Sequence, residues 1–264
     1  MTDGVQLSTV RTRRGLEIEV QTRGTGADLV WFHGLVGLAP TEPVLDLLAE
    51  TFKVHAPVWP GYGSIENETD VEDMLEFALL GWDIVDALGV VRPHLVGHSF
   101  GAMIAAEMAC VARNDLDRLA LVAPYGLWVD SCPLPDPFAT LPFELADLLF
   151  DDPANAPKLL PPGLDLSTDQ GLAEFMIRNN RRLGTAGKIM FPIPNRRLSK
   201  RLYRLTAPTA VIFGSGDRLV DPHYAEAWQA ALPDAHVSTL SGGHLLNLEA
   251  HEALAAALAA FFVD

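Results

Sequence analysis

Residues 94–101 read His-Leu-Val-Gly-His-Ser-Phe-Gly, and an apolar segment of helical length, residues 102–112, follows them directly. Within this stretch, residues 97–101 have the pattern Gly-x-Ser-x-Gly between a short apolar strand and a helix. A serine at such a turn has a strained backbone, so the residues beside it must be small. Glycine on both sides of the turn lets the strand and the helix approach closely. The segment therefore predicts that Ser99 is a nucleophile presented at the end of a buried strand.

Apolar segments of strand length alternate with helical segments on both sides of this turn. The predicted strands are residues 16–21, 29–32, 52–56, 94–96, 119–122, 209–213 and 237–240. The predicted helices are residues 41–50, 71–88, 100–112, 223–232 and 249–262. Residues 119–122 and 210–213 are apolar on both faces, which is typical of a parallel sheet covered by helices on both sides. The pattern predicts an α/β fold.

The alternation is interrupted over residues 125–205, which contain many prolines and no convincing strand. Charge is segregated there, because residues 126–174 carry nine acidic side chains and one lysine, whereas residues 175–205 carry nine basic side chains and no acidic one. A long strandless stretch between two buried strands is typical of an inserted lid. We therefore predict a core of residues 1–124 and 206–264, with residues 125–205 forming a cap of short helices.

A serine hydroxyl is a poor nucleophile alone, so a base and an orienting acid should follow it in the chain. Asp217 lies in the glycine-rich loop 214–222 after one predicted strand, and His244 lies in the loop 241–244 after the next. Both loops follow the carboxyl ends of their strands, which form the functional edge of an open α/β sheet. We predict that Asp217 fixes the tautomer of His244, and that His244 takes the proton of Ser99.

An ester carbonyl under attack also needs hydrogen-bond donors for its developing negative charge. Phe100, directly after the nucleophile, would offer its backbone N–H. The second donor should come from residues 33–37, His-Gly-Leu-Val-Gly, where Leu35 is the preferred residue and Val36 the alternative. His33 and His98 are expected to serve packing, without a separate catalytic role.

Together these features resemble the serine hydrolases of the α/β-hydrolase superfamily, and the resemblance covers nearly the whole chain. The motifs that carry it are His33-Gly34, residues 60–64 (Pro-Gly-Tyr-Gly-Ser), residues 97–101, the Asp217 loop, and Gly243-His244 followed by Glu249. The resemblance implies an eight-stranded, mostly parallel sheet with helices on both faces and a helical cap inserted after the sixth strand. Within the superfamily, the chain is similar to small bacterial esterases and to the carbon–carbon hydrolases of ring-cleavage pathways.

The chain departs from those carbon–carbon hydrolases in one place, because Leu245 follows the predicted catalytic histidine where they usually have tryptophan. Their cap arginine would correspond to Arg178, Arg181 or Arg182. Trp128 begins the cap, where packing is the simpler role and pocket lining the alternative. A serine nucleophile also differs from the aspartate of epoxide hydrolases and haloalkane dehalogenases.

The charge inside the predicted cap suggests a hypothesis about the substrate. Residues 175–205 carry nine positive charges in a chain of net charge −15. In a cap that lies over the nucleophile, one or two of Arg178, Arg181 and Arg182 would enter the pocket, and a guanidinium suits a carboxylate. We hypothesise a substrate with a carboxylate or another anionic group. The alternative is that these charges face water or neutralise the acidic half of the cap.

Composition excludes several other classes of protein. The 264 residues include 34 acidic and 19 basic side chains, so a nucleic-acid partner is not expected. Two cysteines exclude a disulfide scaffold and a cysteine-built metal site. No secretory signal is recognisable, and the longest apolar run, residues 253–263, is too short to span a membrane. We expect a cytoplasmic enzyme, monomeric or homodimeric, that acts on a small molecule without a cofactor or a metal.

Three functions agree with these residues. The first is hydrolysis of an ester, thioester or lactone through an acyl-enzyme on Ser99, as in carboxylesterases. The second is hydrolysis of a carbon–carbon bond in a vinylogous diketone from ring cleavage. The third is ligand binding without catalysis, which a broken set of catalytic residues would favour, and here the set is complete.

Overall fold

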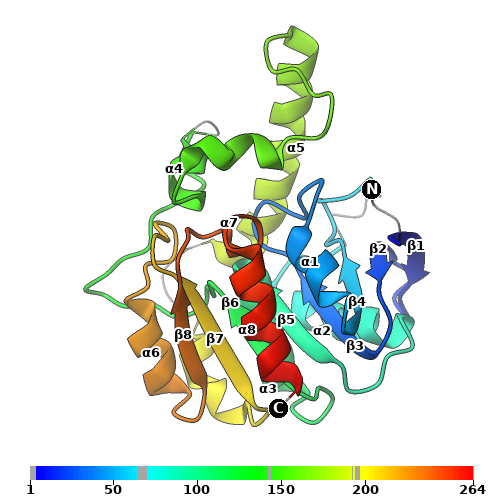
Figure 1. Ribbon diagram of the computed structural model, residues 1–264, viewed down its shortest axis with the longest axis vertical. Helices are drawn as coiled ribbons and strands as arrows, with labels where there is room; N and C mark the ends of the chain where they lie inside the picture. The colour runs from blue at the N-terminus through cyan, green and yellow to red at the C-terminus, as the bar shows by residue number, and fades with distance from the viewer. Residues whose placement is uncertain (1–3, 65–69, 142–143, 192, 194–196, 264) are drawn as a thin grey trace.

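The computed structural model describes residues 4–64, 70–141, 144–191, 193 and 197–263. An eight-stranded sheet forms its centre, with the strand order β1-β2-β4-β3-β5-β6-β7-β8 (Figure 1). The pairs β1–β2 and β2–β4 are antiparallel, and all other neighbours are parallel. The expected eight-stranded, mostly parallel sheet is therefore confirmed.

Seven of the strands coincide with predicted segments to within a few residues. The strands are Gln6–Arg11 (β1), Glu17–Arg23 (β2), Ala27–Phe32 (β3), Phe52–Pro57 (β4), His94–His98 (β5), Leu119–Val122 (β6), Thr209–Gly214 (β7) and His236–Leu240 (β8). The residue pattern did not predict β1. This strand lies at the edge of the sheet and nearly all its side chains are exposed, so no apolar alternation marks it in the sequence.

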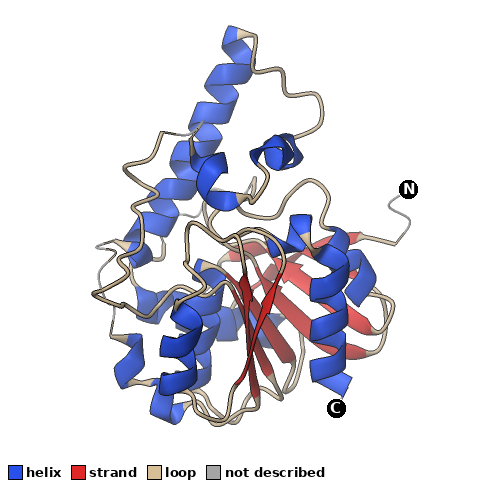
Figure 2. Cartoon of the chain, turned by 60° about the vertical axis from the view of Figure 1, so that its left-hand side comes forward, coloured by secondary structure: helices blue, strands red, loops and turns tan. Residues whose placement is uncertain are grey.

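Helices cover both faces of the sheet, as Figure 2 shows. The α-helices are Pro43–Leu48 (α1), Met74–Ala87 (α2), Phe100–Val111 (α3), Leu145–Leu149 (α4), Asp169–Met190 (α5), Tyr224–Ala231 (α6), Leu246–Glu249 (α7) and His251–Val263 (α8). Three 3₁₀ segments are Pro153–Leu159 (η1), Leu198–Lys200 (η2) and Leu202–Arg204 (η3). The core side chains of α1 and α8 pack on one face, and those of α2, α3 and α6 on the other. The predicted helix over 249–262 corresponds to α8, whereas the short helix α7, which ends at Glu249, was not predicted.

The chain between β6 and β7 contains helices and no strand in its described part, and it rises above the sheet (Figures 1 and 2). The expectation of short helices was wrong for α5, which is 22 residues long. Its N-cap, Thr168, accepts a hydrogen bond from the backbone N–H of Gly171. The prolines of this region lie on either side of residues 163–191, so their high number concealed a long uninterrupted helix.

The basic half of this insertion is attached to the core. The guanidinium of Arg201 donates two hydrogen bonds to the carboxylate of Glu107 in α3. The Nε of Arg204 donates to the carbonyl oxygen of Cys110 at 2.6 Å. Arg178 pairs with Glu174 at 3.4 Å, across the boundary between the acidic and the basic half. Positive charge thus anchors the insertion on helix α3, a role that the sequence did not suggest.

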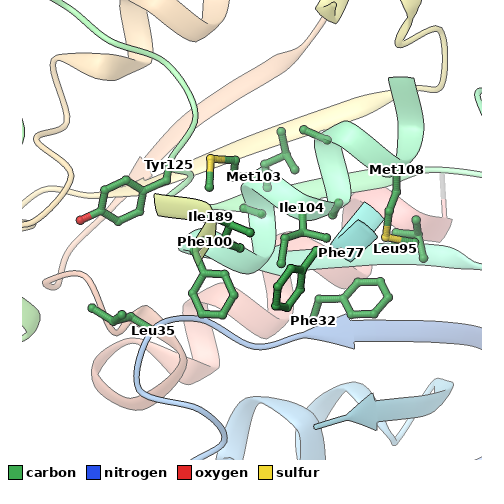
Figure 3. Close-up of a cluster of buried hydrophobic side chains, with 14 of the residues drawn as sticks. Phe32, Leu35, Phe77, Leu95, Phe100, Met103, Ile104, Met108, Tyr125 and Ile189 are labelled. Atoms are coloured by element: carbon green, nitrogen blue, oxygen red, sulfur yellow. The ribbon is translucent and has the colours of Figure 1, made fainter. Parts of the chain in front are cut away.

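The order of the strands along the sheet reverses at β3, which lies between β4 and β5. This arrangement positions the site. The loops that follow β3 and β5 meet at the carboxyl edge of the sheet because the two strands are parallel neighbours. An apolar cluster holds α3 against these strands, and it includes Phe32 of β3, Leu95 of β5 and Ile104 of α3 (Figure 3). None of the described helices has the length and apolar composition of a membrane span.

Candidate active site

Ser99 occupies a strained turn between β5 and α3. Its backbone has φ 59° and ψ −124°, a conformation that residues other than glycine rarely adopt. A Cβ on Gly97 would lie 2.5 Å from the Cα of Ala102, and a Cβ on Gly101 would lie 2.4 Å from the carbonyl oxygen of His33. Both glycines are therefore required for strand, turn and helix to approach each other this closely.

The three predicted catalytic side chains are in contact. The Nε2 atom of His244 lies 2.7 Å from the Oγ of Ser99, and its Nδ1 lies 2.8 Å from the Oδ2 of Asp217. The Oδ1 of Asp217 accepts the backbone N–H groups of Leu219 and Val220, each at 2.8 Å. Those two bonds orient the carboxylate, so its second oxygen accepts Nδ1–H and leaves Nε2 free to accept the serine proton.

Burial closes this group of residues off from solvent. Ser99 and His244 have no exposed surface, and Asp217 is 4% exposed. Hydrogen bonds between such groups are electrostatically stronger than in water. The Oγ of Ser99 is thus covered by surrounding side chains in this conformation.

Two further histidines beside the site are buried and neutral. Burial lowers the pKa of His33 and that of His98 to about 3. The Nε2 of His98 donates to the carbonyl oxygen of His244 at 2.8 Å, which supports the backbone of the base. The Nε2 of His33 accepts the backbone N–H of Trp59 at 3.1 Å. Both rings therefore act as hydrogen-bonding groups within the packed core.

The two backbone groups predicted to stabilise negative charge lie next to Ser99 in the chain or in space. Phe100 is the first residue of α3, and Leu35 follows Gly34, on which a Cβ would lie 2.6 Å from the Cβ of Ser99. Within the described residues, neither the N–H of Leu35 nor that of Phe100 donates a hydrogen bond. Both groups are thus available, and their role as donors to substrate remains a prediction.

The carboxylate of Glu249 joins the histidine loop to the insertion. It accepts the backbone N–H groups of Gly243 (2.8 Å), Asp151 (3.0 Å) and Asp152 (3.1 Å), and the Nδ2 of Asn155 (3.1 Å). The sequence motif included Glu249 but offered no role for it. Four donors on one carboxylate fix the beginning of η1 against the loop that carries the base.

Two cavities lie under the insertion, and neither is lined by Ser99, Asp217 or His244. An open groove of about 750 Å³ lies between α5 and the segment around Tyr62. A pocket of about 270 Å³ is lined mostly by aliphatic side chains of α4, η1 and α5, with Leu35 on its core side. Arg178 and Arg182 line both cavities, whereas Arg181 lines only the groove.

Trp128, the other predicted pocket residue, lines neither of these two cavities. Its indole N–H donates to the carboxylate of Asp130 at 2.9 Å, so it packs at the start of the insertion. Asp130 is an alternative to Asp217, because the superfamily that the sequence resembles has members that take the acid from the strand before the cap. The carboxylate that contacts the histidine ring here is that of Asp217.

Arg182 is a half-buried cation at the wall between the cavities, and its Nε atom is fully covered. Burial lowers the pKa of its guanidinium to about 10, and its Cζ would lie 3.6 Å from a Cβ on Gly37. The Nε of Arg182, the hydroxyl of Tyr62 and the Nδ2 of Asn179 are buried without a hydrogen-bond partner. No carboxylate of the described residues forms an ion pair with Arg182. A buried cation without a counter-charge is costly, which suits a position that a ligand completes.

The sequence model of the alpha/beta hydrolase family matches residues 29–257. The chain belongs to the alpha/beta hydrolase family. This hydrolase is 26% identical over 245 residues to the dihydrolipoyllysine-residue acetyltransferase component of the acetoin cleaving system of Cupriavidus necator. That match covers 89% of this chain and 63% of the relative, so the chain spans less than two thirds of that protein.

Solved structures show the same fold. A bacterial membrane phospholipase A superposes with a TM-score of 0.81 at 23% identity, covering 98% of this hydrolase and 86% of that chain. The 2-hydroxy-6-oxo-6-phenylhexa-2,4-dienoate hydrolase of Rhodococcus sp. strain RHA1 superposes with a TM-score of 0.76 at 20% identity, covering 98% and 100%. The names of these two proteins refer to different substrates, and at such identities the likeness concerns the fold alone.

One buried pair in this hydrolase had no signal in the sequence. The Oε2 of Glu42 accepts the Nδ2 of Asn247 at 2.9 Å, and its Oε1 accepts the backbone N–H of Ala39 at 2.6 Å. Glu42 and Asn247 are 205 residues apart in the chain, so only the folded structure brings them together. No cluster of three or more His, Cys, Asp or Glu side chains suited to a metal occurs among the described residues.

Nucleophile and base should act as a unit in this hydrolase. We expect Ser99→Ala and His244→Ala each to lower kcat for an activated ester by about 10⁴–10⁶, and the double variant to lose little more. An organophosphonate followed by mass spectrometry of peptides should modify the wild type at Ser99 alone. Stoichiometric modification of Ser99→Ala would falsify the assignment.

The acid can be tested with a matched pair of variants. Asp217→Asn should keep the fold and lower kcat by up to about 10⁴, because an amide favours the wrong tautomer of the base. Asp130→Asn, whose carboxylate contacts Trp128 instead, should leave kcat nearly unchanged. Steady-state kinetics with thermal unfolding as the folding control decide between them. If the two variants behaved the other way round, Asp130 would have to replace Asp217.

Proposed function

We propose that this protein hydrolyses carboxylic esters, with thioesters and lactones as related substrates, through an acyl-enzyme on Ser99. The observation that carries the proposal is the pair of contacts from His244, 2.7 Å to the serine Oγ and 2.8 Å to the carboxylate of Asp217. A hydroxyl bonded to a neutral imidazole, which a carboxylate orients, is the arrangement that acyl transfer to serine requires.

In the first half of the reaction, the Oγ of Ser99 attacks the ester carbonyl carbon while Nε2 of His244 takes the hydroxyl proton. The carbonyl oxygen becomes negatively charged and would accept hydrogen bonds from the backbone N–H groups of Leu35 and Phe100. When the tetrahedral intermediate collapses, the bond to the alcohol oxygen breaks and His244 gives that oxygen the proton. Asp217 stabilises the imidazolium that exists between these two transfers.

In the second half, water replaces the alcohol. His244 takes a proton from the water molecule as its oxygen attacks the acyl carbon, and the same two N–H groups stabilise the oxyanion. The bond between the acyl carbon and the Oγ of Ser99 then breaks, and the proton returns to that oxygen. The products are the carboxylic acid and the free enzyme, so no cofactor enters the balance.

The aliphatic pocket supports an apolar acyl or alkyl group as part of the substrate. Two of its lining residues, Leu35 and Leu149, lie close to the site. Leu35 follows Gly34, which lies against Ser99. The carbonyl oxygen of Leu149 accepts the backbone N–H of Leu245, the residue after His244. Its volume of about 270 Å³ suits a small organic group. We therefore expect an acyl chain bound to Ser99 to extend towards this pocket.

A second candidate is hydrolysis of a carbon–carbon bond in a vinylogous diketone that carries a carboxylate. The observation that favours it is the half-buried Arg182, which lacks a counter-charge among the described residues. Leu245 in the place of tryptophan counts against this candidate. Ligand binding without catalysis has less support, because the contacts among the three catalytic side chains are complete.

The two candidates predict different substrate preferences. We expect the wild type to hydrolyse p-nitrophenyl esters, with kcat/KM rising with acyl length until the chain fills the aliphatic pocket. The same panel should contain lactones and a ring-cleavage diketone, with Ser99→Ala as the control for uncatalysed hydrolysis. A diketone with the highest kcat/KM would replace the ester reaction with the second candidate.

An anionic substrate group can be tested through Arg182. At low salt the wild type should have a higher kcat/KM for a dicarboxylate half-ester than for the matching monoacid ester. Arg182→Ala should reduce this ratio about tenfold or more, because a hydrogen bond to a charged group contributes ~1.5–3 kcal/mol. Arg181→Ala is the matched control, because Arg181 lines only the outer groove. Equal preferences in the wild type and in Arg182→Ala would remove this part of the proposal.

A further inference from the structure

A buried side-chain contact joins the end of the loop after β3 to helix α7, which directly follows the loop that carries His244. Glu42 ends the loop that carries Leu35, and Asn247 lies in α7, three residues after His244. Their side chains meet at 2.9 Å, from Nδ2 of the amide to Oε2 of the carboxylate. The two residues are 3% and 4% exposed, so water does not compete for this bond.

The strength of this hydrogen bond depends on whether the carboxyl group of Glu42 is ionised. The ionised carboxylate accepts both the Asn247 amide and the backbone N–H of Ala39, and hydrogen bonds to a charged acceptor are stronger than neutral ones. Burial raises the pKa of Glu42 to about 7. The charged groups that act on it are Arg23 and Asp46, which form an ion pair with each other at 2.6 Å.

We infer that Glu42 is a positioning residue for the reaction proposed above. It acts through Asn247 to fix the position of the Leu35 loop relative to the His244 loop. This inference rests on the proposed function, since it assigns a part to both loops in the same step. The base must stay within reach of Ser99 Oγ while an oxyanion donor faces the other side of the same carbonyl. A contact between the two loops fixes that relation, whereas contacts within either loop do not.

The direct test is an exchange of chemical groups across the contact. Asn247→Asp places two carboxylates opposite each other, and we expect kcat to fall about tenfold or more while KM changes less than about twofold. Adding Glu42→Gln supplies an amide donor to the new aspartate and should recover most of the lost kcat. Glu50→Gln, which alters an exposed carboxylate just beyond α1, is the matched control and should change neither constant.

The pH dependence provides a second readout, which a purely structural role would not move. In the wild type, protonation of Glu42 should steepen the acid limb of log kcat against pH, and in Glu42→Gln that contribution should disappear. The free energy of unfolding should depend on pH in the opposite sense: ionisation of Glu42 should raise kcat but lower the stability of the folded protein. The folded-state pKa of Glu42 is raised from 4.5 to about 7, so the folded protein holds the proton more tightly than the unfolded chain. The wild type should therefore lose stability relative to Glu42→Gln as the pH rises between these values.

Thermal unfolding distinguishes misfolded variants from mispositioned ones. If Asn247→Asp does not fold, the alanine variants Glu42→Ala and Asn247→Ala replace it, with a double variant that should lose little more kcat than either single one. Additive losses, or no recovery in the exchange pair, would overturn the positioning role.

Failure of the proposed function has a different signature. If the wild type hydrolyses no ester but an organophosphonate still modifies Ser99, the ester reaction is wrong. The modification rates of the same variants then decide the positioning role, with the same order expected as for kcat. A wild type that neither hydrolyses an ester nor reacts with the organophosphonate would overturn both.

Discussion

The strained turn at Ser99 constrains the rest of this structure. A non-glycine residue at φ 59° is held there only because α3 packs tightly against the sheet behind it. That packing requires glycine at positions 97 and 101, where a Cβ would collide with backbone atoms. It also requires β3 and β5 to be neighbours, so that Gly34 can lie against the side chain of Ser99. The strand order and the helix position are thus consequences of presenting one hydroxyl at the edge of the sheet.

The insertion between β6 and β7 is partly built into the catalytic framework. Glu249 and the Leu245–Leu149 hydrogen bond attach its first half to the histidine loop, and Arg218, the neighbour of Asp217, donates to carbonyl oxygens of Asp147 and Phe150. Its second half contributes α5 and the wall of both cavities. The insertion therefore forms the walls of the cavities, whereas Ser99, Asp217 and His244 lie on the core.

Two ionisable groups near the site stand out because desolvation shifts the pKa of each. Arg182 lies at the cavity wall without a carboxylate partner among the described residues, and Glu42 joins two loops of the site. An apolar side chain of similar size would avoid the desolvation cost of the charge at either position. Groups of this kind are found where a ligand or a reaction makes use of them, and both lie beside the predicted oxyanion loop. Substrate charge and loop register are the two properties that they would control.

Local residue patterns were sufficient for the parallel strands, the turn at Ser99 and the chain order of Ser99, Asp217 and His244, because each is encoded by neighbouring residues. The resemblance to a family implied an eighth strand but not its place in the chain, since the exposed side chains of edge strand β1 leave no apolar pattern. The length of α5 was hidden by prolines on either side of it. The burial of Arg182, the four donors around Glu249 and the Glu42–Asn247 bond join residues far apart in the chain. No local pattern encodes such contacts, because they arise only when the sheet, its loops and the insertion have packed together.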